Sequence, residues 1–229
     1  AGSVALPPAV QARIREVFGA ELTAEQVVAR VLQDVRAEGD AAVRRYTAAF
    51  DGAEVSAFRV SEAEVEAAVA AASPALVEAL EVAARQLRAF HARAQRRSWV
   101  EFQGEGALGQ LIRPLGRVAV YAPGGRAPYP SSVVHAVVPA RVAGVREVVV
   151  ATPPRPDGSV TPSILVAARV AGADAVYRVG GAQAIAALAY GTEQIPRVDK
   201  IVGPGNLFVV LAKRAVYGVV GTDGLPGPT

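Results

Sequence analysis

Apolar positions in the first hundred residues recur at helical spacing. The first clear stripe follows a capping box formed by Thr23 and Gln26, and it ends before Gly39. Its apolar members lie three, four and seven positions apart: Val27, Val28, Val31, Leu32 and Val35. This spacing predicts an amphipathic helix with one buried face.

Further helical patterns follow before residue 100. Gly39 and Asp40 are predicted to end the first helix, and a second helix is predicted to begin at once, with Val43, Tyr46 and Phe50 on one face. Ser61 and Glu64 form another capping box. Ser73 and Pro74 supply the N-cap and the first-turn proline of a long helix that passes through Leu80, Leu87 and Phe90. The first part of the chain is therefore predicted to be mainly helical.

A β-hairpin is predicted at the end of this helical part. Residues 99–102 and 108–112 form two short apolar runs, and the glycine-rich sequence GEGA lies between them. We expect the helical segment before Gly104 to pack apart from the sheet that follows.

The pattern changes at Arg117, where short apolar runs begin to alternate with helical patterns. Strands are predicted at 118–122, 147–151, 175–179 and 200–202. Helices are predicted at 131–143, 161–171, 182–190 and 206–217. Strands that are apolar on both faces and joined by helices indicate an α/β fold, with a Rossmann-like parallel sheet covered by helices on both faces.

The change of pattern also predicts how the chain divides. Residues 1–112 are expected to form the helical segment and hairpin as part of a first domain. Residues 113–221 are expected to form the Rossmann-like nucleotide-binding domain, and 222–229 the start of a return into the first domain. This division places any ligand of the sheet within the second part of the chain.

Composition excludes several classes of function. The 24 basic and 21 acidic residues give a net charge of +3, and the nearest basic cluster, Arg93, Arg96 and Arg97, has the spacing of a solvated helix face. No nucleic-acid partner is therefore expected. No apolar run reaches the length of a membrane span, and the sequence has no cysteine. These features predict a cytoplasmic protein without a membrane partner.

Three of the four predicted strands lead directly into glycine-rich turns. These turns are 121–125, 179–183 and 203–206, and each precedes a predicted helix. In a parallel α/β sheet, ligands bind at the carboxyl ends of the strands, and exposed helix N-termini there hold anions. We expect a phosphate-bearing ligand at this edge. The G-x-G-x-x-G fingerprint is absent, so the residues alone predict only a nucleotide-binding α/β domain.

Polar and aromatic side chains in these turns are candidates for ligand contact. Tyr121 could stack on a base or a nicotinamide, or it could be an ordinary core tyrosine. Gln183 and Asn206 could bind a ligand, or each could cap a helix. His91 and His135 lack partners at ligand spacing and are interpreted as structural. No general base stands out.

Three segments resemble the histidinol dehydrogenase family: VRAEGDAAVRRYTAAFDG at 35–52, RPLGRVAVYAPGG at 113–125 and VGGAQAIAALAYGTEQIPRVDKIVGPGN at 179–206. The resemblance implies a zinc- and NAD-dependent enzyme, usually a homodimer. Such an enzyme oxidises L-histidinol through histidinal to L-histidine, the last step of histidine biosynthesis.

The resemblance also implies roles for particular residues. Tyr121, Gln183 and Asn206 fall on positions that contact NAD in the family. Thr229 falls on a position that contacts the substrate, in a segment that resembles the signature I-D-x-x-A-G-P-S/T-E. The sequence departs from that signature at Thr222 and Pro226, where Ile and Ala are usual.

No residue of this chain matches the zinc ligands or the Glu–His catalytic pair of the family. These are expected downstream of residue 229, so no catalytic or metal-binding residue is expected here, and the 229-residue chain alone is expected to be inactive. Two alternatives stay open at this point. One is a paralogous NAD-dependent dehydrogenase of another small alcohol, such as a sulfonated diol. The other is a non-catalytic nucleotide-binding module.

Overall fold

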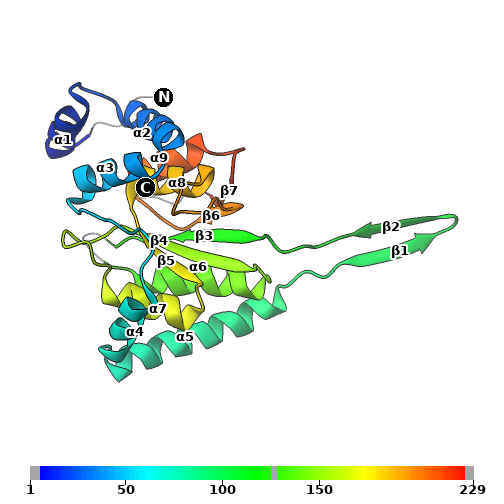
Figure 1. Ribbon diagram of the computed structural model, residues 1–229. Helices are drawn as coiled ribbons and strands as arrows, with labels where there is room; N and C mark the ends of the chain where they lie inside the picture. Colours follow the sequence, from blue (N-terminus) through cyan, green and yellow to red (C-terminus); the bar gives the residue numbers. More distant parts are fainter. Residues whose placement is uncertain (1–5, 125–127, 225–229) are drawn as a thin grey trace.

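The computed structural model describes residues 6–124 and 128–224. Its centre is a five-stranded sheet in the order β5-β4-β3-β6-β7 (Figure 1). The strands are β3 (Arg117–Tyr121), β4 (Glu147–Thr152), β5 (Ala175–Arg178), β6 (Lys200–Val202) and β7 (Gly221–Thr222). All neighbouring strands are parallel; Val118, for example, lies opposite Val148 on one side and Lys200 on the other. The predicted parallel sheet is confirmed, and the short β7 is an addition that the pattern did not predict.

Helices cover both faces of the sheet (Figure 1). They are α1 (Pro8–Phe18), α2 (Ala24–Glu38), α3 (Asp40–Asp51), α4 (Glu62–Ala70), α5 (Pro74–Arg93), α6 (Pro130–Val142), α7 (Pro162–Ala171), α8 (Gly181–Tyr190) and α9 (Leu207–Ala215). The predicted capping boxes at Thr23 and Ser61 are both present. Two core clusters result. One joins the sheet to α2, α3, α8 and α9, and the other joins it to α4, α5, α6 and α7.

The expectation that the helical segment packs apart from the sheet is wrong. α2 packs on α8 and α9, α3 packs on α8, and α4 and α5 pack on α6 and α7. The physical reason lies in α8, in which every residue from Ala182 to Ala189 is buried. A helix that is apolar all round must be covered on its outer side as well. The early helices therefore form outer layers over the crossover helices of the sheet.

A polar junction fixes the start of α3 against the loop after α8. The Glu193 carboxylate accepts a hydrogen bond from the backbone N–H of Asp40 at 2.8 Å. In return, the Asp40 carboxylate accepts one from the backbone N–H of Gln194. Gly39 has a positive φ of 57°, and a Cβ there would lie 2.5 Å from the Glu193 carboxylate. These contacts explain Gly39, Asp40 and Glu193 by packing.

The predicted hairpin forms and extends away from the rest of the molecule (Figure 1). β1 (Trp99–Gln103) and β2 (Gly106–Gln110) are antiparallel, with Trp99 opposite Gln110. All ten residues are exposed, among them Phe102 at 83%. Because they are exposed, the apolar side chains of the hairpin are available for contact with another surface. An isolated two-stranded hairpin is marginally stable at best, so such a contact would stabilise it.

Within the two described ranges, no single helix is both long and apolar enough to cross a membrane. α4 and α5 meet the length and composition criteria only as a pair, and the pair is bent by 111°.

Candidate functional site

The fold brings the glycine-rich turns together at the carboxyl edge of the sheet. The turns after β3, β5 and β6 lead into α6, α8 and α9. The Tyr121 hydroxyl accepts a hydrogen bond from the backbone N–H of Gly181 at 3.1 Å, and this bond links the first two turns. Gly203 packs directly against the backbone carbonyl of Tyr121, which links the first turn to the third.

Packing inside the chain accounts for the glycines of these turns. A Cβ at Gly180 would lie 2.5 Å from the Cβ of Pro153, and one at Gly203 would overlap the Tyr121 carbonyl. Gly181 has a positive φ of 62°, and a Cβ there would lie 2.5 Å from the Gln183 side-chain oxygen. The glycines are therefore no independent argument for a phosphate ligand. The evidence for a site must come from the side chains.

Tyr121 is a core residue at the end of β3. It is 4% exposed, and burial raises the pKa of its phenol to about 12. Its hydroxyl orders the first turn of α8 through the bond to Gly181. In the structure, Tyr121 is therefore a core tyrosine, the second of the two interpretations, since it packs among other buried side chains.

Gln183 is the buried polar side chain of this edge, with an exposure of 1%. It caps no helix, because the N-cap of α8 is Gly180 and its position carries no side-chain cap bond. The Gln183 amide nitrogen donates instead to the carboxylate of Asp51, at 3.3 Å. The capping interpretation of Gln183 is thus wrong, and its amide belongs to a polar cluster between α8 and α3.

Asn206 caps α9, so the capping interpretation of this residue is confirmed. Its side-chain oxygen accepts a hydrogen bond from the backbone N–H of Val209 at 3.1 Å. The residue is exposed, and the cap uses only the amide oxygen. Within the described part of the chain, the amide nitrogen has no protein partner and remains a donor at the carboxyl edge.

Asp51 belongs to the same cluster as Gln183 and was missed by the sequence analysis. It ends α3, and burial raises the pKa of its carboxyl from 3.8 to about 7. Its charge in turn contributes to the raised pKa of Tyr121. No Lys, Arg or His of residues 6–124 and 128–224 forms an ion pair with it. The only local signal was an aspartate before Gly52, which also suits a helix end.

A second missed group fixes the turn after β6. Lys213 is 1% exposed, and its ammonium donates to the backbone carbonyl of Gly203 at 2.9 Å and pairs with Asp223. The Asp223 carboxylate also accepts a hydrogen bond from the backbone N–H of Gly203 at 2.7 Å. This buried ion pair ties the turn before Asn206 to the segment that follows β7.

The described residues do not fit a zinc ion. Residues 6–124 and 128–224 contain no group of three or more His, Asp, Glu or Cys side chains that could hold a metal. The His135 Nδ1 lies 2.9 Å from the backbone oxygen of Ser131, one turn earlier in α6. Thr229 and Pro226 lie outside the described residues, while Thr222 lies in β7.

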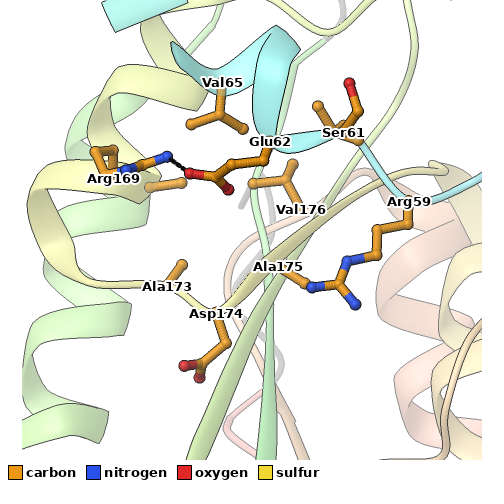
Figure 2. A pocket seen from close by; sticks show the side chains of 11 residues that line it. Arg59, Ser61, Glu62, Val65, Arg169, Ala173, Asp174, Ala175 and Val176 are labelled. Atoms are coloured by element: carbon orange, nitrogen blue, oxygen red, sulfur yellow. Dashed lines mark hydrogen bonds and ion pairs between the residues drawn. The ribbon is translucent and has the colours of Figure 1, made fainter.

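Two clefts differ in their relation to this edge. A cavity of about 360 Å³ lies at the amino end of β5, where Glu62 and Arg169 form an ion pair (Figure 2). It is at the wrong end of the strand for a ligand of the turns. A wider, mainly apolar groove of about 530 Å³ runs along α6 over β3 and β6, and it reaches Gly203 and Pro204 at the carboxyl edge.

Fold and edge together define an α/β protein of the doubly wound type, with a polar cluster at the strand ends where such sheets bind ligands. The family model for histidinol dehydrogenase matches residues 16–229, and the chain belongs to that family.

Individual relatives agree with this assignment. The chain is 56% identical to a histidinol dehydrogenase of Deinococcus radiodurans over 226 residues, which are 99% of this chain and 51% of the relative. It is 54% identical to one of Moorella thermoacetica, over 94% of this chain and 52% of the relative. A crystal structure of histidinol dehydrogenase from Elizabethkingia anophelis matches with a TM-score of 0.86 at 34% identity, over 97% of this chain and 52% of that one. The chain spans about half the length of the relatives it matches.

Proposed function

We propose that this chain is the cofactor-binding part of a histidinol dehydrogenase, which oxidises L-histidinol through histidinal to L-histidine with NAD⁺. The observation that carries the proposal is the family match over residues 16–229. Relatives named histidinol dehydrogenase at more than 50% identity favour this substrate over that of a paralogue, and they favour an enzyme over a non-catalytic module.

The proposed cofactor site is the carboxyl edge, with Tyr121, Gln183 and Asn206 as its residues. Three features of the structure support it. Asn206 presents an amide donor that has no protein partner within residues 6–124 and 128–224, Gln183 lies beside a carboxylate, and the α8 and α9 N-termini lie at the same edge. NAD⁺ bound here would accept the hydride. The contribution of the chain would be to bind and orient it.

Zinc has no fitting ligands among the described residues, so no step of the reaction is assigned to zinc in this chain. We propose that the zinc ligands and the Glu–His catalytic pair belong to the part of the relatives that this chain does not match. Thr229 is proposed to contact the substrate. It follows that the 229 residues alone bind NAD⁺ but neither hold stoichiometric zinc nor oxidise histidinol.

The remaining expectations are kept as proposals. A homodimer is supported by the exposed apolar hairpin, since large apolar surfaces of this kind mark interfaces. The cytoplasmic location and the division at 1–112, 113–221 and 222–229 also stay predictions.

The proposal is tested with the purified 229-residue chain in three measurements. Calorimetric titration with NAD⁺ is expected to show one site per chain. Elemental analysis is expected to show less than stoichiometric zinc, and an NADH-absorbance assay with histidinol no turnover. Absence of NAD⁺ binding would overturn the cofactor site. One zinc per chain, or turnover at about 1–10³ per second, would show that the catalytic groups lie within this chain.

A further inference from the structure

Within the cluster formed by Tyr121, Gln183 and Asp51, the Asp51 side chain is the one that a ligand can reach most directly. Tyr121 and Gln183 are buried, at 4% and 1% exposure, whereas Asp51 is only partly buried. Tyr121 and Gln183 thus lie inside the cluster, and Asp51 is its partly exposed member. Its position at the end of α3 follows from the packing of α3 on α8.

The hydrogen-bonding capacity of this carboxylate is largely unused. An ionised carboxylate offers about four acceptor positions. Within the described residues, the Asp51 carboxylate accepts one long bond, from the Gln183 amide, and forms no ion pair. Burial without compensation disfavours its charged form, which is the cause of its raised pKa. A side chain held in this state is stabilised by any ligand that brings hydrogen-bond donors to it.

The chemistry of the carboxylate selects the kind of donor. It repels phosphate groups and accepts hydrogen bonds from hydroxyl groups, and a vicinal diol can occupy both of its oxygens. Sheets of this type commonly bind a dinucleotide ribose through an acidic side chain at the strand ends. Here that acidic side chain would come from the helical segment and not from the sheet.

We infer that Asp51 is a further cofactor-binding residue of this chain, whose carboxylate accepts hydrogen bonds from the hydroxyl groups of a ribose of NAD⁺. The inference rests on the proposed cofactor site and deepens it. It makes the end of α3 part of that site and gives the buried Gln183 a second task, because the Gln183 amide then holds the carboxylate in place.

The experiment is a set of calorimetric titrations at pH 8, where Asp51 is ionised. NAD⁺, AMP and nicotinamide mononucleotide are titrated into the unchanged chain, Asp51→Asn, and the control Glu66→Gln. Glu66 is an exposed carboxylate on α4, which packs over the other face of the sheet. Loss of hydrogen bonds to a charged acceptor is expected to weaken NAD⁺ binding about ten- to a hundredfold in Asp51→Asn. Glu66→Gln is expected to bind as the unchanged chain does.

The two mononucleotides identify the ribose. The one that carries it is expected to lose affinity in Asp51→Asn, while the other binds unchanged. A double-mutant cycle with Gln183→Ala separates direct contact from an effect transmitted through Gln183. If Asp51→Asn lowers the affinity in the Gln183→Ala background as well, Asp51 contacts NAD⁺ independently of Gln183, as the inference requires.

The remaining outcomes are also decisive. Unchanged NAD⁺ affinity in Asp51→Asn, with normal binding by the unchanged chain, overturns the inference and leaves the proposed function intact. Absence of NAD⁺ binding by the unchanged chain overturns both. Thermal unfolding of each variant guards against misfolding, and a structural role would predict that Asp51→Asn loses stability. A cofactor-binding role predicts weaker binding at equal or higher stability.

Discussion

The two ends of α3 both carry a partly or fully buried aspartate that contacts the segment around α8, but the two aspartates differ in how they are satisfied. Asp40, at the start, accepts a hydrogen bond from the backbone of Gln194 and pairs with Arg44 at 3.5 Å. Asp51, at the end, accepts one long bond from Gln183 and has no ion pair within the described residues.

This difference distinguishes a carboxylate with a structural role from one with a ligand-binding role. A buried carboxylate whose acceptors are filled by its own chain stabilises the fold, and the first junction does so. A buried carboxylate with unfilled acceptor positions costs free energy, and groups with strongly shifted pKa values cluster at functional sites. Both ends lie in the segment 35–52 that resembles the family, so the resemblance alone does not distinguish them.

The largest expected effect concerns the pH dependence of stability at the second end. The pKa of the Asp51 carboxyl is about 7 in the folded state and near 3.8 in the unfolded state. Its contribution to the free energy of unfolding is therefore fully present below pH 4 and is lost as the pH rises to 7. The difference between these two pKa values corresponds to at most about 4 kcal/mol of stability. Asp51→Asn is expected to remove this loss, and denaturant unfolding at pH 5 and pH 8 measures it. A loss of equal size in the variant would show that other groups cause it.

At the first end, Asp40→Ala is expected to lower the free energy of unfolding by about 2–3 kcal/mol, since it leaves the backbone N–H of Gln194 without its acceptor and removes the ion pair with Arg44. Asp40→Asn retains an acceptor oxygen and is expected to lose less. Urea denaturation measures both, and NAD⁺ titration of the folded variants is expected to give the affinity of the unchanged chain. Weakened NAD⁺ binding would place this end in the site as well.

The next effect is on affinity alone. Gln183→Ala is expected to weaken NAD⁺ binding by about 1–2 kcal/mol, the loss of a hydrogen bond with an unpaired partner. Gln194→Ala is the matched control, because Gln194 is a glutamine of the structural junction that donates to the backbone of Ser56 and accepts from that of Phe58. Equal affinities for NAD⁺ in the two variants would contradict the assignment of Gln183.

The smallest effect separates the two tasks of Asn206. Asn206→Ala is expected to cost about 1 kcal/mol of stability through loss of the helix cap. Asn206→Asp keeps the capping oxygen and removes only the amide donor. If Asn206 contacts NAD⁺, the aspartate variant binds it more weakly at unchanged stability. Unchanged affinity in that variant would reduce Asn206 to a cap.

Most of the fold could be predicted because local sequence patterns indicate its helices and strands. The strands at 118–122 and 147–151, for example, lie within a residue or two of β3 and β4. The packing position of the early helices could not be predicted from their own apolar faces, because an apolar face does not indicate which surface it packs on. The uniformly apolar sequence of α8 was the signal that a second layer was needed.

The site was predictable only in part. In the sequence, the glycines of the turns indicate a ligand. In the structure, Gly180 and Gly203 are required by close contacts with Pro153 and the Tyr121 carbonyl, which are far from them in sequence. The sequence around Asp51 and Lys213 did not identify them as site residues, since their states depend on tertiary burial. The carboxyl edge itself followed from topology, because parallel strands place their ends together.

The most direct test of the central claim is amide hydrogen exchange of the 229-residue chain with and without NAD⁺. If the cofactor binds at the second end of α3, NAD⁺ slows exchange at 51–53, 180–184 and 206–210. The first junction, at 39–41 and 193–195, keeps its rates. Protection confined to the first junction, or to the hairpin at 99–110, would contradict the account.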